Sequence, residues 1–277
     1  MAANTLRGAL GYTFRQVACQ PECTEAKTCV VRETCAYARI FEPVSDGAGP
    51  SGLADPPRPF VFRAAHLDQQ TFERGQAFHF DVHLFDRHPD TVEYFERSFA
   101  RLVKPGWGPL VRMDRSDESV ALEACSYPVE RVEVRFVTPM ELKAGHQLAE
   151  RPDFGVLLSR IRDRLSSLGA LYGEGPLEMD FTAFGRRAAA VRMTRCELGH
   201  ETISRYSTRT KQTHSLGGFT GIAEYSGDLA EFVPFLMAAQ FTGVGRQTPW
   251  GKGEIAVYAN SPESGPVLSA NRSALAP

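Results

Sequence analysis

The order of strands and helices predicted for residues 126–260 is the feature that most constrains this fold. Apolar and polar side chains alternate over residues 131–137, which is typical of a strand with one buried face. Two amphipathic helices are predicted, capped by Asp153 and by Asp228. Further extended stretches are predicted at residues 177–184, 188–198, 218–225 and 253–258. The resulting order, strand–helix–strand–strand–helix–strand, predicts a ferredoxin-like domain.

The first half of the chain predicts a smaller set of elements. A helix is predicted around residues 6–11, a strand at residues 76–85, and a further helix that starts at Pro89 and Asp90. Residues 45–59 are rich in Gly, Pro and Ser and predict a loop. The whole chain has 277 residues, which suits one large domain or two of about 100–150 residues each.

Composition indicates a soluble globular protein. Hydrophobic residues make up 43% of the chain and charged residues 23%, and no apolar run approaches the roughly 18 residues of a membrane span. The first ten residues lack the charged-then-apolar pattern of a signal peptide. We therefore expect a cytoplasmic protein without a membrane partner, whose six cysteines are reduced thiols or metal ligands.

Charge is distributed unevenly along the chain. The formal net charge is -2 and the pI is near 6.4, which taken alone argues against nucleic-acid binding. Residues 186–214 nevertheless carry a local excess of basic side chains, opposed only by Glu197 and Glu201. The basic residues are Arg186, Arg187, Arg192, Arg195, Arg205, Arg209 and Lys211. Because RNA responds to the field within about 8–10 Å, this segment predicts an RNA-binding surface, with a solvated face as the ordinary alternative.

Four cysteines follow the first predicted helix. They are Cys19, Cys23, Cys29 and Cys35, with the spacing C-x3-C-x5-C-x5-C. Four thiolates this close together in a reducing compartment predict a structural zinc site, which would staple this segment and place Arg32 and Arg39 near RNA. An iron–sulfur cluster fits the same ligand count, and unliganded thiols are the third alternative.

A glycine-rich turn separates the last predicted helix from the last predicted strand. It reads GVGRQTPWGKG over residues 243–253. Its glycines and cations are Gly243, Gly245, Arg246, Gly251, Lys252 and Gly253. Glycines let a backbone approach a phosphodiester closely, and the cations add positive charge. The turn lacks the Gly-Lys-Ser/Thr end of a Walker loop, and it follows a helix, which excludes a dinucleotide fingerprint. A phosphate-binding loop and a plain structural turn both fit these residues.

Several further sequence motifs accompany the glycine-rich turn. The motif RYSTR at residues 205–209 and the motif GGFTG at residues 217–221 precede it. Further motifs are LRGALG at residues 6–11, CAYARIFEP at 35–43, RPFVF at 58–62 and RFVTPMELK at 135–143. Over most of its length the chain therefore resembles the CRISPR repeat-processing endoribonucleases of the RAMP superfamily.

This resemblance implies an α+β fold with two ferredoxin-like domains in tandem. We expect an N-terminal domain at residues 1–125 with the Cys-rich insertion at 19–35, a C-terminal domain at 126–260, and a flexible tail at 261–277. The family's first strand precedes the LRGALG helix, whereas only residues 1–5 stand there. We therefore expect the first domain to be short by about one strand.

The resemblance also implies a reaction and its partners. Such enzymes bind the repeat of a CRISPR precursor transcript and cut it once per repeat without a catalytic metal. The 2′-hydroxyl attacks the adjacent phosphate, and many members keep the mature crRNA as a subunit of an effector complex. The residues expected to bind RNA are Arg7, Arg32, Arg205, Arg209, Lys211, Gly243, Gly245, Arg246, Gly251, Lys252 and Gly253.

The catalytic residues are where this chain departs from the family. Such enzymes commonly supply a histidine from the N-terminal domain, yet no histidine precedes His66. The candidates here are Arg15 and Tyr12 from the first helix and Arg39 from the CAYARIFEP motif. Arginine is a poor base, but it can orient RNA and stabilise the pentacovalent transition state. His214, in the basic segment, is the alternative proton-transfer group.

Three functions stay open at this stage. The leading hypothesis is a metal-independent endoribonuclease that produces mature crRNA. The missing early histidine keeps a second hypothesis open, a non-catalytic crRNA-binding RAMP subunit of an effector complex. The near-neutral pI favours a third, a zinc-dependent scaffold that joins proteins.

Overall fold

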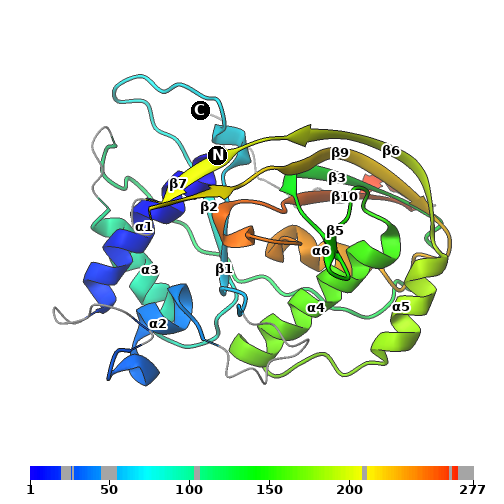
Figure 1. Cartoon of the computed structure of the whole chain (residues 1–277), viewed down its shortest axis with the longest axis horizontal. Coiled ribbons are helices and arrows are strands. Elements are labelled where there is room, and N and C mark those ends of the chain that lie inside the picture. Colours follow the sequence, from blue (N-terminus) through cyan, green and yellow to red (C-terminus); the bar gives the residue numbers. More distant parts are fainter. Residues whose placement is uncertain are drawn as a thin grey trace. The chain divides into compact units, whose positions relative to one another are not determined.

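The computed structural model shown in Figure 1 describes residues 1–19, 26, 28–44, 55–102, 107–207, 211–261 and 264–267. The chain divides into two compact units. Unit 1 comprises Met1–Glu118, Asp163–Leu177 and Pro249–Gly251, and unit 2 comprises Ser119–Arg162, Glu178–Thr248 and Lys252–Pro277. None of the helices in the described part of the chain combines the length and apolar character that a membrane span requires.

Unit 2 is built on an antiparallel sheet with the spatial order β11-β10-β3-β9-β6. The strands are β3 (Arg131–Met140), β6 (Arg192–Glu201), β9 (Gly218–Ser226), β10 (Ile255–Ser261) and β11 (Ser264–Val267). Helix α4 follows β3 and helix α6 follows β9, so the chain order is the ferredoxin-like one that the sequence predicts.

Three helices cover one face of this sheet (Figure 1). They are α4 (Phe154–Tyr172), α5 (Phe181–Ala190) and α6 (Val233–Thr242). The core between helices and sheet is aromatic, since the Phe154 ring lies 4.9 Å from Tyr225 and 5.3 Å from Phe232. The buried Tyr225 hydroxyl donates a 2.6 Å hydrogen bond to the Pro152 carbonyl. Burial raises the pKa of this phenol.

Two expectations for unit 2 are wrong. Residues 177–184 were expected to be extended, but α5 begins at Phe181 because the Asp180 carboxylate accepts 2.9 Å hydrogen bonds from the amides of Thr182 and Ala183. These bonds satisfy first-turn N–H groups that a helix otherwise leaves without partners. The tail was expected to be flexible throughout, but its Ser264–Val267 segment pairs with β10 as β11.

Unit 1 has the element order helix–helix–strand–strand–helix, starting with α1 (Ala2–Ala18). The other elements are α2 (Ala36–Phe41), β1 (Phe60–Arg63), β2 (Asp81–Leu84) and α3 (Thr91–Ala100). Strands β1 and β2 pair antiparallel. The core is a cluster of rings around Phe14, whose centroid lies 4.9 Å from Phe41 and 5.3 Å from Phe95. The two predicted helices are confirmed, and the strand expected at residues 76–85 shortens to β2.

Candidate nucleic-acid interface

A short hairpin in unit 2 brings several of the predicted residues together. It consists of β7 (Ser204–Ser207) and β8 (Gln212–Ser215). The register places Arg205 directly opposite His214, so these two side chains share one face of the hairpin. Burial lowers the pKa of the Arg205 guanidinium from its ordinary value. The hairpin therefore presents a cation beside an imidazole, which suits contact with a phosphodiester.

The remaining hairpin residues extend this surface. Tyr206 is 59% exposed and lies on the face opposite Arg205. Lys211 is exposed at the start of the second strand, and Arg209 lies outside the described residues. Exposed aromatic rings stack on unpaired bases, and exposed lysines meet phosphates. Tyr206 was not among the predicted site residues, although its position inside the RYSTR motif was a usable signal.

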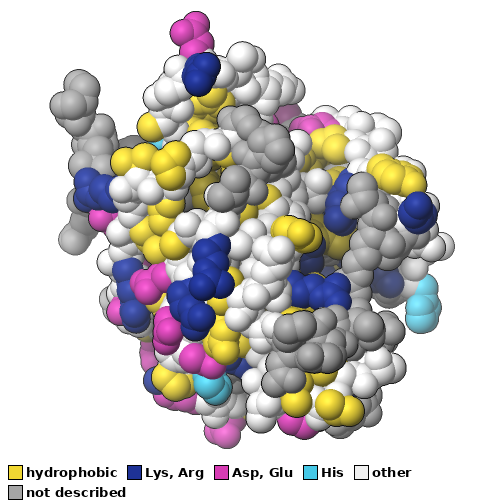
Figure 2. Space-filling model, turned by 90° about the vertical axis from the view of Figure 1, so that its left-hand side faces the viewer, with side chains coloured by type: hydrophobic (Ala, Val, Ile, Leu, Met, Phe, Trp, Pro, Cys, Tyr) yellow, Lys and Arg dark blue, Asp and Glu magenta, His cyan; other side chains and the backbone are white. Residues whose placement is uncertain are grey.

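Two other arginines of the basic segment are hydrogen-bonded to carboxylates of the protein itself. Arg187 makes hydrogen bonds of 2.7 and 2.5 Å to Glu231, and Arg195 makes bonds of 2.8 and 2.7 Å to Glu197. The bond from Arg195 holds the pKa of the Glu197 carboxyl below its usual range. On the face drawn in Figure 2, Lys and Arg side chains lie in separate groups, with Asp and Glu side chains beside some of them. The basic excess read from the sequence is thus partly neutralised.

The glycine-rich loop presents one of its two cations outward. The Arg246 side chain is 49% exposed, and its amide donates a 3.1 Å hydrogen bond to the Glu141 carbonyl. The guanidinium lies 4.0 Å from the Glu141 carboxylate, which leaves it accessible to a second anion. Arg246 therefore keeps the position expected of an RNA-binding residue.

The second cation of the loop, Lys252, is buried, and the prediction that it binds RNA is wrong. Its side chain is 0% exposed, and its Nζ donates 2.6 Å hydrogen bonds to the Glu141 carboxylate and to the Gly217 carbonyl. Burial lowers the pKa of this lysine, while the bond to Glu141 acts in the opposite direction. The ammonium group holds the GGFTG segment, the loop and the end of β3 together inside unit 2.

The loop glycines are required by the protein's own packing. Gly253 has φ 74°, and a Cβ there would overlap the Val244 carbonyl oxygen. Gly251, in unit 1, has φ 88°, and a Cβ there would overlap the Ala3 side chain. Both residues are buried, which contradicts their expected role as a backbone cradle for phosphate. Gly243 ends α6 with φ 70°, and Gly245 lies against the Glu141 carbonyl.

Helix α1 in unit 1 carries three of the predicted residues. Tyr12 is exposed, so its hydroxyl is accessible to a ligand. The Arg15 guanidinium lies 6.0 Å from the centre of the Tyr37 ring. The Arg7 guanidinium lies 5.4 Å from the Trp250 ring in the tip of the glycine-rich loop. Aromatic faces attract these cations and fix where they lie.

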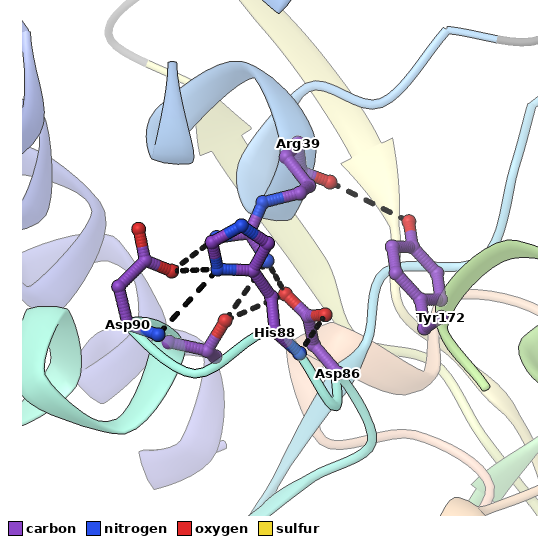
Figure 3. Close-up of polar contacts among 6 residues, drawn as sticks. Arg39, Asp86, His88, Asp90 and Tyr172 are labelled. Carbon is purple, nitrogen blue, oxygen red and sulfur yellow. Dashed lines mark hydrogen bonds and ion pairs between the residues drawn. The ribbon is translucent and has the colours of Figure 1, made fainter. Parts of the chain in front are cut away.

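Arg39, at the end of α2, is held by two aspartates (Figure 3). Its Nη1 pairs with Asp86 and donates a 2.9 Å hydrogen bond to the Thr91 hydroxyl, and its Nη2 donates a 2.7 Å bond to Asp90. The Asp86 side chain is only 4% exposed. The Tyr172 hydroxyl donates a 3.5 Å bond to the Arg39 carbonyl, and burial raises the pKa of this phenol. The Arg39 guanidinium is committed to protein carboxylates, so this geometry contradicts a direct catalytic contact.

The same cluster contains His88, which was not among the predicted site residues. Its Nδ1 lies 2.5 Å from the Asp90 carboxylate, and its amide donates a 3.0 Å hydrogen bond to Asp86 (Figure 3). The sequence signal was the DRHPD motif at residues 86–90, in which a histidine lies between two aspartates.

Three of the four predicted zinc ligands lie among the described residues. Cys19 and Cys35 are partly buried against the core of unit 1, and Cys29 is half-buried. Cys23 lies outside the described residues. Within the part of the chain that is described, no three His, Cys, Asp or Glu side chains are gathered as a metal would need. The zinc site stays a prediction, and Arg32 lies half-exposed in the 3-10 turn Arg32–Thr34 of this segment.

Family models match both halves of the chain. The AF_1859_N model, described as an N-terminal domain, matches residues 1–135. The model of the CRISPR-associated endoribonuclease Cas6 matches residues 134–255. Residues 134–255 carry a Cas6 endoribonuclease domain. The protein is therefore an enzyme of CRISPR RNA processing, and the resemblance drawn from the motifs is confirmed. The Cas6 match includes the β7–β8 hairpin, β9 and the glycine-rich loop.

Solved Cas6 structures share this fold. The product complex of Thermus thermophilus Cas6 (TTHB231) is 17% identical, with a TM-score of 0.56 over 92% of this chain and 93% of that one. The product complex of a second Cas6 (TTHA0078) is also 17% identical, with a TM-score of 0.52 over the same shares. None of the curated proteins compared with the chain matches it.

Proposed function

We propose that this Cas6 protein cleaves CRISPR repeat RNA without a catalytic metal. The 2′-oxygen forms a bond to the adjacent phosphorus, the bond from phosphorus to the 5′-oxygen breaks, and a 2′,3′-cyclic phosphate and a 5′-hydroxyl result. The nucleophile is part of the substrate, so the protein supplies in-line geometry, proton transfer and positive charge. All three can come from side chains.

The β7–β8 hairpin is the observation that carries this proposal. Arg205 and His214 share one face of it, the exposed Tyr206 lies on the other, and Lys211 stands at its turn. RNA recognition combines cations for phosphates with aromatic faces for unpaired bases. The hairpin offers both within a few residues, and Arg246 adds a further exposed cation in unit 2.

Helix α1 supplies the candidate transition-state groups. Arg15 is held over Tyr37 and brings a permanent charge, and the exposed Tyr12 brings a hydroxyl donor. A fixed guanidinium stabilises the negative charge that develops on the pentacovalent phosphate. Arg39, bound to Asp86 and Asp90, acts as a positioning residue.

Zinc and retention of the product complete the proposal. Cys19, Cys23, Cys29 and Cys35 hold a structural zinc, whose four protein ligands leave no position open for chemistry. The mature crRNA stays bound and joins an effector complex with the protein. Support for retention comes from the two Cas6 relatives, which are both product complexes.

Cleavage is expected to persist in EDTA. The purified chain is incubated with repeat RNA of its own array, and the ends of the products are identified while the zinc content is measured before and after chelation. We expect an unchanged rate and a 2′,3′-cyclic phosphate. Loss of cleavage in EDTA that Mg²⁺ restores would contradict metal independence, and tight binding without cleavage would indicate the non-catalytic subunit.

Replacing Arg246 by Ala is expected to weaken binding of repeat RNA about fivefold, the equivalent of about 1 kcal/mol. Because one phosphate contact is lost, the dependence of log affinity on log salt should become shallower by about 1. The matched control is Arg187→Ala, whose guanidinium is already bound to Glu231. Equal losses in both variants, measured by filter binding over a salt series, would show that Arg246 has no specific role.

A further inference from the structure

The loop between β2 and α3 holds a histidine in a defined orientation. His88 is 50% exposed, and its Nδ1 lies 2.5 Å from Oδ1 of Asp90. The amide of Asp90 is farther from the same nitrogen, at 3.4 Å. The shorter contact identifies Nδ1 as the donor to the carboxylate. A neutral imidazole has one donor and one acceptor nitrogen, so Nε2 of His88 is then the acceptor.

The groups that hold His88 are themselves fixed. Asp90 accepts a 2.7 Å hydrogen bond from Arg39, and Asp86 pairs with the same guanidinium and accepts a 2.6 Å bond from the Thr91 hydroxyl. Asp86 also accepts the backbone N–H of His88 at 3.0 Å. Figure 3 shows these side chains converging from α2, the loop and the start of α3. The ring is therefore held at one edge by protein groups, while half of it stays open to solvent.

A carboxylate on one nitrogen of a half-exposed imidazole is the arrangement by which proteins fix a general base. The carboxylate selects the tautomer and stabilises the imidazolium that forms when the other nitrogen takes a proton. Among the described residues, Asp86 and Asp90 contact His88, Arg39 binds both of these carboxylates, and Arg87 beside His88 pairs with Glu174.

We propose that His88 is the general base of the cleavage reaction, an inference that rests on the function proposed above. Nε2 of His88 takes the proton of the 2′-hydroxyl as the bond from the 2′-oxygen to phosphorus forms. The bond from phosphorus to the 5′-oxygen breaks, and the 5′-oxygen takes a proton from water, to which the imidazolium returns its own. No proton is gained or lost overall. Asp90 is a positioning residue that acts through His88.

The test measures single-turnover cleavage of repeat RNA by the full chain at saturating protein, together with RNA affinity and the unfolding temperature. His88→Ala should cleave about 100-fold or more slowly than the parent, in the range that a positioned base contributes. Its RNA affinity and unfolding temperature should stay at parental values. Added imidazole should restore part of the rate, because a free base can enter the vacated position.

Three further variants complete the test. His146→Ala, at an exposed position of unit 2, should cleave at the parental rate. Asp90→Asn should slow cleavage, and imidazole should not restore it, because the His88 ring still fills the position. His214→Ala should bind RNA more weakly, and added imidazole should not raise its rate.

Several results would overturn the inference. If the parent cleaves and His88→Ala cleaves equally fast, His88 is not the base, although the proposed function stands. If His88→Ala loses RNA affinity or stability in proportion to its rate, the residue is structural. If imidazole restores His214→Ala and not His88→Ala, the base is His214. If the parent itself does not cleave the repeat RNA, the proposed function fails first.

Discussion

Lys252→Met is expected to lower the free energy of unfolding by about 3–5 kcal/mol, the range observed when one partner of a buried ion pair is removed. The substitution leaves the Glu141 carboxylate, which is only 14% exposed, without its ammonium partner. It also leaves the Gly217 carbonyl without its donor. Urea unfolding of the full chain measures the change, and the melting temperature should fall with it.

Two controls separate the buried pair from a general effect of charge. Adding Glu141→Gln to Lys252→Met removes both charges and should recover part of the loss, because no unpaired charge is then buried. Arg246→Ala removes the exposed cation of the same loop and should change stability by less than about 0.5 kcal/mol. If Lys252→Met unfolds like the parent and instead loses only RNA affinity, Lys252 faces RNA after all.

Gly253→Ala is expected to destabilise the protein by about 2–5 kcal/mol. A left-handed backbone costs about 1–2 kcal/mol for a residue with a Cβ, and overpacking adds about 1–3 kcal/mol. Gly253 has φ 74°, and its carbonyl accepts a 2.9 Å hydrogen bond from Val244 across the loop. An added Cβ meets the backbone of Val244, which cannot move without breaking this bond. Thermal unfolding of the full chain is the measurement.

Gly199→Ala is the matched control for this substitution. Gly199 lies in β6 of the same unit, and a Cβ there meets no atom within 4 Å. We expect its stability to stay within about 0.5 kcal/mol of the parent. A Gly253→Ala protein that unfolds normally but binds RNA poorly would support the phosphate-cradle interpretation that the packing contradicts.

Much of unit 2 could be predicted from local patterns. The alternation in β3 and the helical spacing in α4 are strong signals, because one face of each element is buried against the other layer. Helix α5 begins inside residues 177–184, for which the sequence pattern predicts an extended segment. The Asp180 cap decides that segment, since its carboxylate satisfies two amides of the first turn.

The candidate site was less predictable than the fold. The DRHPD motif contains His88, but nothing in the motif shows that Arg39 binds Asp90, which lies fifty-one positions after it in the sequence. Lys252 and Arg246 look equivalent as cations of one loop. Only one of them is accessible, because Lys252 is turned toward Glu141, 111 positions away.

The sequence by itself determined the ferredoxin-like element order of unit 2 and, through its motifs, the resemblance to CRISPR repeat-processing endoribonucleases. These follow from short-range patterns, since the periodicity of apolar residues sets strands and helices and the glycines mark the turns. Only the tertiary structure decided which charged side chains are accessible to RNA. Burial and ion pairing depend on partners distant in sequence, and a buried or paired cation has little capacity left for phosphate.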